Sequence, residues 1–307
     1  MSKPQMSILV PVRNEGRRLC AAIRSIVEGR STHFPLQIVL VDDASTDGCC
    51  DLVPPYTIRR HQVEIVRIRL DRWSGIPFAR NQAAAASTAD ILFITDANVL
   101  FPKNWDVAVR KHIAPARVLC ATIADSGSSF RGYGGTLHLP SMKFHWLKTP
   151  RACGGYVPLS PCTGTVLHAA LFRRAGGYDT EMPVYGAAEP EFSVRLWLSG
   201  AEIVSVPNLV LSHRFRPSQE RRPFLDAIAS LQVQNYLRFG LLYLEQPQIA
   251  QLLQYYASEF PAQFENAFRR TQSGSVWQRR QILRSRLPRS FTSFAERFGL
   301  FRGDSYP

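Results

Sequence analysis

The sequence predicts an α/β fold with a mostly parallel, doubly wound central sheet, followed by an α-helical C-terminal tail. Apolar runs at 7–12, 36–41 and 91–94 are short and β-branched, as in strands buried on both faces of a sheet. Segments with helical spacing separate these runs across about the first hundred residues. Each run also ends in polar residues, at the strand ends where open α/β sheets bind their ligands.

The helix after the first strand is predicted from its apolar spacing. Leu19, Ile23 and Ile26 recur at intervals of three and four residues, which places them on one face. Asn14 is a candidate N-cap for this helix, because an Asn side-chain oxygen can accept a backbone N–H from the first turn. The sequence therefore predicts a strand, a short polar loop and an amphipathic helix.

The following units repeat this order. The strand at 36–41 ends in two carboxylates and a Ser/Thr pair within 42–48, which predicts another helix start. A third strand at 64–68 alternates apolar and polar residues. Gly75 then opens an Ala-rich helix that leads back to the strand at 91–94. The first hundred residues thus predict the parallel half of the sheet.

The second half of the chain has a different composition. The stretch 125–164 is rich in glycine, proline and aromatic residues, and a loop region of this length is typical of a functional surface. Helical spacing returns at 189–198, and a strand is predicted at 201–207. Amphipathic helices are predicted beyond residue 214.

Length and composition limit the class of protein. A chain of 307 residues with 45% hydrophobic residues can bury one large core or two closely packed ones. No apolar run approaches the roughly 20 residues of a membrane-spanning helix, and the first residues lack the apolar stretch of a signal peptide. Six cysteines at irregular spacing resemble neither a disulfide framework nor a zinc site. The sequence therefore predicts a cytoplasmic protein.

Charge is concentrated near the C-terminus. The net charge is +13, which suits a nucleic acid, an acidic lipid surface or a phosphorylated substrate. Seven Arg and no acidic residue occupy 269–289. This region fits a solvated helical face, helices packed on the rest of the chain, or peripheral contact with an anionic carrier or the inner face of a membrane. Nucleic acid has the least support, because no known reader motif accompanies the charge.

Motifs at four strand ends in the first half resemble those of the family-2 glycosyltransferases, which have the nucleotide-sugar-binding GT-A fold. The matching segments are VPVRNE at 10–15, VDDASTD at 41–47, GIPFARN at 75–81 and TDAN at 95–98. All four occur in the family's order, each next to a predicted strand end. The resemblance implies a GT-A fold for this chain.

The second half is similar to the related polypeptide N-acetylgalactosaminyltransferases. The segments that carry this similarity are GGT at 134–136, KFHW at 143–146, YGAAEPE at 185–191, FSVRLW at 192–197 and SHRFR at 212–216. With the first half, the resemblance implies a catalytic domain at 1–216. Residues 1–100 would be its nucleotide-binding half and 101–216 its acceptor and metal half, with an Arg-rich helical extension at 217–307.

The resemblance implies a divalent metal held by Asp96, Asn98 and His213. Mn²⁺ is expected because it accepts both oxygen and imidazole ligands, with Mg²⁺ as the alternative. Asn98 departs from the family, which has an acidic or His ligand there. Taken alone, Asp96 and Asn98 are also ordinary turn residues after a strand, and His213 an ordinary hydrogen-bonding residue.

The resemblance also implies the residues that would contact the nucleotide-sugar donor. They are Pro11, Arg13, Glu15, Asp42, Asp43, Gly75, Arg80, Asp96, Trp146, Tyr185 and Arg216. Asp42, directly at the strand end, is favoured over Asp43 to accept the base N–H or hold the ribose, and Arg80, Arg214 or Arg216 would face the diphosphate. The alternative for Asp43 is that, with Ser45, it caps the next helix.

Glu189 is the candidate general base, with Glu191 as the alternative after a one-turn rearrangement. An inverting displacement needs a base to accept the proton of the acceptor hydroxyl. The structural alternative is a carboxylate favoured by the helix dipole, and Pro190 fits the first turn of such a helix. A retaining reaction, which the second-half similarity implies, stays open.

These implications define a metal-dependent glycosyltransferase of the hexosyltransferase class. It would move a sugar from a UDP-sugar, or another NDP-sugar, to a hydroxyl of a peptide, protein or natural product. A saccharide or lipid-linked acceptor is the alternative. The rival is a degenerate, non-catalytic nucleotide-sugar-binding protein, which Asn98 and Ala188 favour because each replaces an acidic or metal-binding residue of the family.

Overall fold

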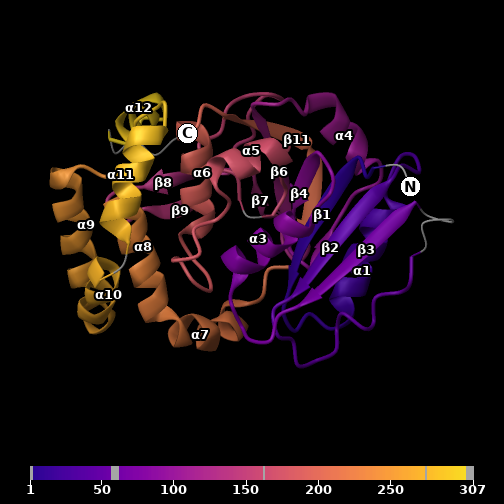
Figure 1. The fold of residues 1–307 in the computed structure, drawn as a ribbon, viewed down its shortest axis with the longest axis horizontal. Coiled ribbons are helices and arrows are strands. Elements are labelled where there is room, and N and C mark those ends of the chain that lie inside the picture. Colours follow the sequence, from indigo (N-terminus) through magenta and orange to yellow (C-terminus); the bar gives the residue numbers. More distant parts are fainter. Residues whose placement is uncertain (1–2, 57–61, 162, 274, 302–307) are drawn as a thin grey trace.

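One mixed sheet forms the centre of the protein (Figure 1). The computed structural model describes residues 3–56, 62–161, 163–273 and 275–301. Within this part of the chain the sheet has nine strands in the order β3-β2-β1-β4-β10-β6-β11-β5, with β7 paired to β6. The bounds are Met6–Val12 (β1), Leu36–Asp42 (β2), Val63–Arg69 (β3), Ile91–Ile94 (β4), Val99–Leu100 (β5), Arg117–Asp125 (β6), Arg131–Gly132 (β7), Thr165–His168 (β10) and Glu202–His213 (β11).

Strand direction confirms the prediction of a mostly parallel sheet. β1 is parallel to β2 and β4, β2 is parallel to β3, and β11 is parallel to β6. β10 is antiparallel to both β4 and β6, and the short β5 is antiparallel to β11. The polar ends of β1, β2 and β4 therefore meet at one edge, as open α/β sheets require for ligand binding.

The helix α1 (Arg17–Glu28) buries Leu19, Ile23 and Ile26, as its spacing predicts. The N-cap prediction for Asn14 is wrong. Gly16 occupies the N-cap position without a side-chain cap. The Asn14 side-chain oxygen instead accepts the backbone N–H of Thr46 at 2.8 Å, which ties the exit of β1 to the exit of β2.

The helix predicted directly after β2 is also absent from the described residues, because 43–56 form turns and bends. Asp43 does not cap a helix there. Its carboxylate accepts the backbone N–H groups of Ser74 at 2.7 Å and Gly75 at 2.8 Å. Ser45 accepts the N–H of Asn14 at 3.1 Å. These side chains join loops at the ligand-binding edge, which a local capping rule does not anticipate.

The helices between β3 and the tail flank the sheet. They are α3 (Ile76–Ala86), α4 (Trp105–His112), α5 (Ala169–Ala175) and α6 (Ala188–Leu198). The predicted loop region 125–164 contains a small hairpin, β8 (Gly135–His138) and β9 (Lys143–Trp146). The strand predicted at 201–207 continues to His213, with an irregularity between Val206 and Val210 that accommodates Pro207.

The tail is helical, as predicted. Its helices are α7 (Ser218–Ala227), α8 (Ala229–Tyr243), α9 (Gln246–Glu259), α10 (Pro261–Ser273), α11 (Val276–Arg286) and α12 (Phe291–Arg297). Leu237 and Phe239 of α8 and Phe294 of α12 are buried in the same apolar cluster as Phe192 and Trp197 of α6. The tail therefore packs on the rest of the chain, while the domain division at residue 216 stays a prediction.

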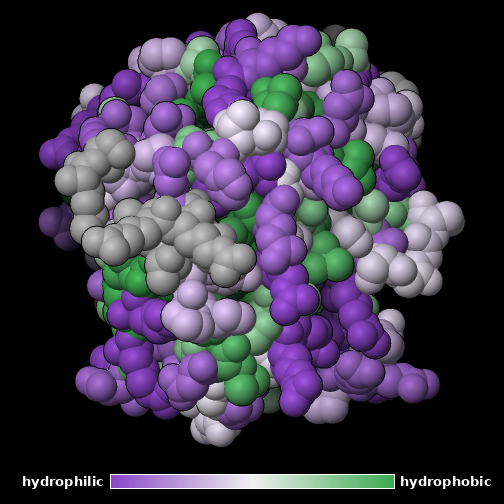
Figure 2. Space-filling view, turned by 90° about the vertical axis from the view of Figure 1, so that its right-hand side faces the viewer, coloured by the Kyte–Doolittle hydropathy of each residue, from purple (hydrophilic) through white to green (hydrophobic). Residues whose placement is uncertain are grey.

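The face of the molecule near β3 and the N-terminus is mostly hydrophilic (Figure 2). Figure 2 shows the face nearest β3 and the N-terminus, where hydrophilic side chains predominate and apolar ones form small, separate patches. In Figure 1 the helices α8–α12 lie on the opposite side of the molecule from β1–β3. None of the helices in the described ranges is both long and apolar enough to span a bilayer.

Candidate active site

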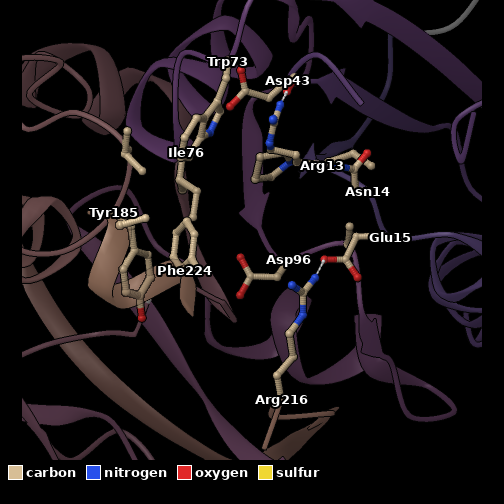
Figure 3. A pocket seen from close by; sticks show the side chains of 15 residues that line it. Arg13, Asn14, Glu15, Asp43, Trp73, Ile76, Asp96, Tyr185, Arg216 and Phe224 are labelled. Carbon is tan, nitrogen blue, oxygen red and sulfur yellow. Dashed lines mark hydrogen bonds and ion pairs between the residues drawn. The ribbon is translucent and has the colours of Figure 1, made fainter. Parts of the chain in front are cut away.

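A pocket of about 480 Å³ lies at the edge of the sheet where β1, β2 and β4 end (Figure 3). Its walls come from these strand ends, from the segment before α3, from the loop before α6 and from the tail. The lining residues are Pro11, Val12, Arg13, Asn14, Glu15, Asp43, Trp73, Ile76, Asp96, Ala97, Val184, Tyr185, Arg216, Phe224 and Ala227. Seven of the predicted site residues are thus brought together: Pro11, Arg13, Glu15, Asp43, Asp96, Tyr185 and Arg216.

One end of the pocket is held by Arg13, Asp43 and Trp73. The Arg13 guanidinium lies 4.8 Å from the centre of the Trp73 ring and donates to the backbone oxygens of Asp43 and Ala44 at 2.5 and 3.0 Å. Two backbone N–H groups hold the Asp43 carboxylate. Both charged groups are therefore fixed before a ligand arrives, which lowers the entropy cost of binding.

Glu15 and Arg216 form a contact across the pocket between segments far apart in the sequence. Arg216 donates to the Glu15 carboxylate at 2.9 Å, and this is the dashed contact in Figure 3. The other Glu15 oxygen accepts from Arg18 at 3.2 Å. Since the Arg216 side chain is 45% exposed, the Glu15–Arg216 pair is weak enough to rearrange around an anionic ligand.

Asp96 and His213 lie together where β4 and β11 end. The Asp96 Oδ2 atom is 3.9 Å from His213 Nε2. Burial lowers the pKa of His213 below its usual value, although Asp96, Glu15 and Asp125 act in the opposite direction. The imidazole is therefore held in its neutral form, which is the form that binds metals. Its Nδ1 atom is buried and has no hydrogen-bond partner among the described residues.

These residues fit a divalent cation. A cation lies about 2 Å from carboxylate and imidazole ligands, so one ion fits between two atoms that are 3.9 Å apart. In the described ranges no group of three or more His, Cys, Asp and Glu side chains is placed to hold a metal. The third predicted ligand is the amide of Asn98, which makes a 3.5 Å contact with the Arg214 backbone oxygen.

Arg80 connects Asp96 to Glu189. Its side chain is fully buried and donates to Asp96 Oδ1 at 2.9 Å and to Glu189 Oε1 at 3.1 Å. One buried guanidinium thus contacts both carboxylates. Burial, and then Glu189, raise the pKa of nearby Tyr236 to about 12.

Several predicted site residues lie outside the pocket. Asp42 accepts from Arg69 at 2.6 Å and from the Ser45 N–H at 2.8 Å. Gly75 contributes its N–H to Asp43, so it supports the pocket from behind. Trp146 lies in an aromatic cluster with Phe215, whose ring centre is 4.2 Å from that of His213.

Glu191 also lies away from the pocket. It is fully buried and pairs with Arg195 at 2.7 Å, and it accepts from the Tyr243 hydroxyl at 2.6 Å. Burial, and next the Glu191 charge, raise the pKa of Tyr243 well above its usual value, so Tyr243 stays a donor. The structure thus gives Glu191 a complete set of structural partners, whereas Glu189 contacts the Asp96 cluster through Arg80.

The structure adds lining residues that sequence patterns missed. Phe224 of α7 lies 6.3 Å from Trp73 and 6.2 Å from Tyr185 between ring centres, so the three rings form an aromatic wall. Val184 and Ile76 line the same side. Ile76 directly follows Gly75 within the segment 75–81, so its place in the motif could have predicted that it lines the pocket. Phe224 had none, because its position depends on how the tail folds back.

Comparisons with known proteins identify the family and the fold. The profile of glycosyl transferase family 2 matches residues 7–176, which is more than half of the chain. The fold is that of the GT-A glycosyltransferases, and the chain belongs to glycosyl transferase family 2. It is 25% identical over 300 residues to human polypeptide N-acetylgalactosaminyltransferase 14, covering 88% of this chain and 50% of the relative. Polypeptide N-acetylgalactosaminyltransferase 8 of Drosophila melanogaster is 25% identical over 230 residues, covering 69% of this chain and 38% of that protein.

The chain spans about half the length or less of these curated relatives. Among solved structures, GalNAc-T7 with UDP, GalNAc and Mn²⁺ has a TM-score of 0.74 at 19% identity, covering 100% of this chain and 58% of that one. A mannosyltransferase from Pyrobaculum calidifontis in complex with GDP-Man and Mn²⁺ has a TM-score of 0.51 at 17% identity, covering 99% and 89%. At these identities the structural similarity establishes the fold alone.

Proposed function

We propose that the chain transfers a sugar from a nucleoside diphosphate sugar, with UDP as the nucleotide, to an acceptor hydroxyl. The observation that carries this proposal is the pocket itself. It places Arg13, Asp43 and Trp73 at one end and Asp96 at the other, beside His213. The first end suits a nucleoside, and the second suits a metal-bound diphosphate.

Each group has a role in this reaction. The Asp43 carboxylate accepts a base or ribose donor, and Trp73 or Tyr185 offers an apolar face for stacking. Asp96, His213 and Asn98 would hold Mn²⁺ or Mg²⁺. A divalent cation there would neutralise charge on the leaving diphosphate. Arg216 supplies a further positive charge at the pocket wall when its pairing with Glu15 rearranges.

Glu189 is proposed as the base of an inverting transfer. Its side chain is only 11% exposed, and Arg80 fixes its position relative to Asp96. Such a base would take the proton of the acceptor hydroxyl as the hydroxyl oxygen bonds to the anomeric carbon and the bond from that carbon to the diphosphate breaks. In a retaining transfer the same carboxylate would instead stabilise positive charge on the sugar. The names of the curated relatives support a peptide or protein acceptor, with a natural product, saccharide or lipid-linked hydroxyl as alternatives.

A second candidate function is nucleotide-sugar binding without turnover. The contacts of Arg80 favour it, because this guanidinium already pairs with the carboxylates of Asp96 and Glu189. The replacement of a metal-binding residue by Asn98 points the same way. This candidate predicts nucleotide binding with no release of product nucleotide from any donor.

Cytoplasmic placement is part of the proposal, with the tail touching an anionic carrier or the inner face of a membrane. The helix α11 exposes Trp277 (42%) and Ile282 (42%) beside Arg284 and Arg286, a combination that suits an acidic lipid surface. Sedimentation with anionic vesicles tests this contact. A chain that stays in the supernatant at low salt would contradict it.

The experiment that tests the catalytic proposal measures UDP release from UDP-sugars with Mn²⁺, with and without acceptor peptides. Metal-dependent UDP release that increases with an acceptor would support transfer. UDP binding without release from any UDP- or GDP-sugar would favour the binding function. A glycosylated product detected by mass spectrometry would identify the acceptor class.

A further inference from the structure

The loop between α5 and α6 has an unusual backbone next to the pocket. Val184 and Tyr185 line the pocket, and Glu189 lies in the first turn of α6. Val184 has φ 64° and Ala187 has φ 65°, with Gly186 at 95° between them. A β-branched residue rarely adopts a positive φ, and such a conformation persists only when its surroundings enforce it. The loop 183–187 therefore needs external support.

One side of the loop is supported by the start of α3. Gly75 pairs with Val184 as an isolated bridge, and the Ile76 N–H donates to the Val184 oxygen at 3.1 Å. The close approach requires a glycine, because a Cβ at residue 75 would lie 2.4 Å from the Val184 backbone. Within the loop, the Tyr185 N–H donates to the Pro183 oxygen and the Ala188 N–H to the Gly186 oxygen, both at 2.9 Å.

Asn235 of α8 supplies a further donor to the loop. It is fully buried. Its Nδ2 group contacts the backbone oxygens of Pro183 at 2.9 Å, Gly186 at 3.1 Å and Tyr185 at 3.3 Å. Three carbonyl oxygens around one nitrogen fix the orientation of the amide, since the opposite orientation would place an oxygen among oxygens.

The other amide atom shows that this arrangement has an energetic cost. Asn235 Oδ1 is buried and has no hydrogen-bond partner among the described residues. A buried acceptor without a partner is unfavourable for folding. An apolar residue of similar size would avoid this cost but would remove the amide donor that the oxygens of Pro183, Tyr185 and Gly186 share. Asn235 therefore donates to the loop, while its own Oδ1 atom has no hydrogen-bond partner among the described residues.

Arg238 contacts the segment that precedes the loop 183–187. It lies three residues after Asn235 on α8, and so projects from a neighbouring position on that helix. Its guanidinium contacts Asp179 and Glu181 at 3.0 Å each, and the Asp179 pair is almost completely buried. Arg279 of α11 reaches Asp179 at 3.1 Å. The tail thus contacts both the loop 183–187 and the segment before it.

We infer that Asn235 is a positioning residue, which holds 183–186 so that Val184 and Tyr185 form the pocket wall. The inference rests on the proposed function for its effect on donor binding, because that wall would face the nucleotide sugar. The helix α8 contributes no lining residue of its own among the described residues. The inference nevertheless gives α8 a role in the site.

The test compares Asn235→Leu with Tyr256→Phe. Tyr256 is a matched control, because its buried hydroxyl also joins the tail to a backbone oxygen, that of Ser141 at 2.8 Å, away from the pocket. Hydrogen exchange of the Tyr185 and Ala188 amides reports the loop directly, since both donate within it at 2.9 Å. Titration with UDP and Mn²⁺ and the donor KM report the pocket.

Asn235→Leu is expected to raise the exchange rate of both amides. It should also weaken UDP binding and raise the donor KM, each by about tenfold, equivalent to about 1.4 kcal/mol. Tyr256→Phe should lower the melting temperature without either effect. If Asn235→Leu does not fold, Asn235→Ala, which leaves room for water, is measured in its place. Unchanged exchange in the folded variant would overturn the inference.

The two proposals fail in distinguishable ways. A wild-type chain that binds no nucleotide would contradict the proposed function, and the exchange comparison would still decide the role of Asn235. Faster loop exchange with unchanged UDP affinity and donor KM would contradict the role of Asn235 in the pocket while leaving the proposed function intact.

Discussion

Arg80 lies fully buried between a candidate metal ligand and the candidate base. Its contacts with Asp96 and Glu189 mean that neither carboxylate can change its charge or position without affecting the other. Metal binding at Asp96 and proton transfer at Glu189 should therefore be coupled. The two acidic residues of α6 can be separated by mutation, because their surroundings differ.

Glu189→Gln should reduce turnover by roughly 10²–10⁴-fold, the usual effect of removing a general base. The amide oxygen can still accept from Arg80, so the fold and UDP binding should be retained. Initial rates and UDP titrations on the same preparation measure both quantities. Near-normal turnover would leave Glu189 as a structural residue at the start of α6.

Glu191→Gln should act on stability. The change leaves Arg195 as a buried charge without its carboxylate, which costs about 3–5 kcal/mol of unfolding free energy. Glu265→Gln is a matched control, because Glu265 and Arg269 are also four residues apart on a helix, but both are exposed. That change should cost less than about 0.5 kcal/mol. Equal denaturation midpoints for the two variants would contradict the structural role of Glu191.

At this scale the motifs predicted the pocket well where a side chain extends from a strand end. Arg13, Asp43 and Asp96 line the pocket because parallel strands bring their carboxyl ends together. Asn14 was misread because its partner, Thr46, is distant in the sequence and local capping rules consider only neighbours. Phe224 could not be predicted, since its contact with Trp73 depends on the path of the tail.

Among the elements, the loop before α6 depends on both α3 and α8. Gly75 allows α3 to approach Val184, and Asn235 holds the loop from the tail side. Longer strands such as β2 were predictable from their apolar runs. The two-residue strands β5 and β7 were not, because so few residues carry no periodic signal.

Gly75→Ala should displace the loop and weaken UDP binding, because the new Cβ would lie 2.4 Å from the Val184 backbone. Gly200→Ala separates this clash from backbone strain. Gly200 has the same φ of 90°, but an added Cβ there meets no atom within 4 Å. Both variants should lose stability, and only Gly75→Ala should lose UDP affinity. Equal UDP affinities would remove Gly75 from the support of the pocket.

In the molecule as a whole, the tail contributes to the central core. Leu237, Phe239 and Phe294 are buried with Trp197 of α6. Composition alone left open whether the Arg-rich tail packs on the chain or stays solvated, since amphipathic spacing predicts an apolar face and does not identify what covers it. The apolar residues of these helices therefore pack on the rest of the chain.

Deletion of 217–307 should prevent cooperative folding of the remaining chain. Each fully buried Leu or Phe contributes roughly 1.5–3 kcal/mol, so losing several exceeds the stability of a typical domain. Circular dichroism and thermal melts of the truncated chain measure this directly. A soluble 1–216 fragment with a sharp melting transition would support two separately folding units.

We propose that Asp96 and His213 form a cation-dependent nucleotide site. Isothermal titration of UDP with and without Mn²⁺ tests it most directly, using wild type, Asp96→Asn and the control Asp90→Asn. Asp90 lies at the opposite end of β4, exposed and paired with Lys3. We predict Mn²⁺-dependent UDP binding that Asp96→Asn abolishes and Asp90→Asn retains. UDP binding that is equally tight without Mn²⁺, or that survives Asp96→Asn, would contradict the account.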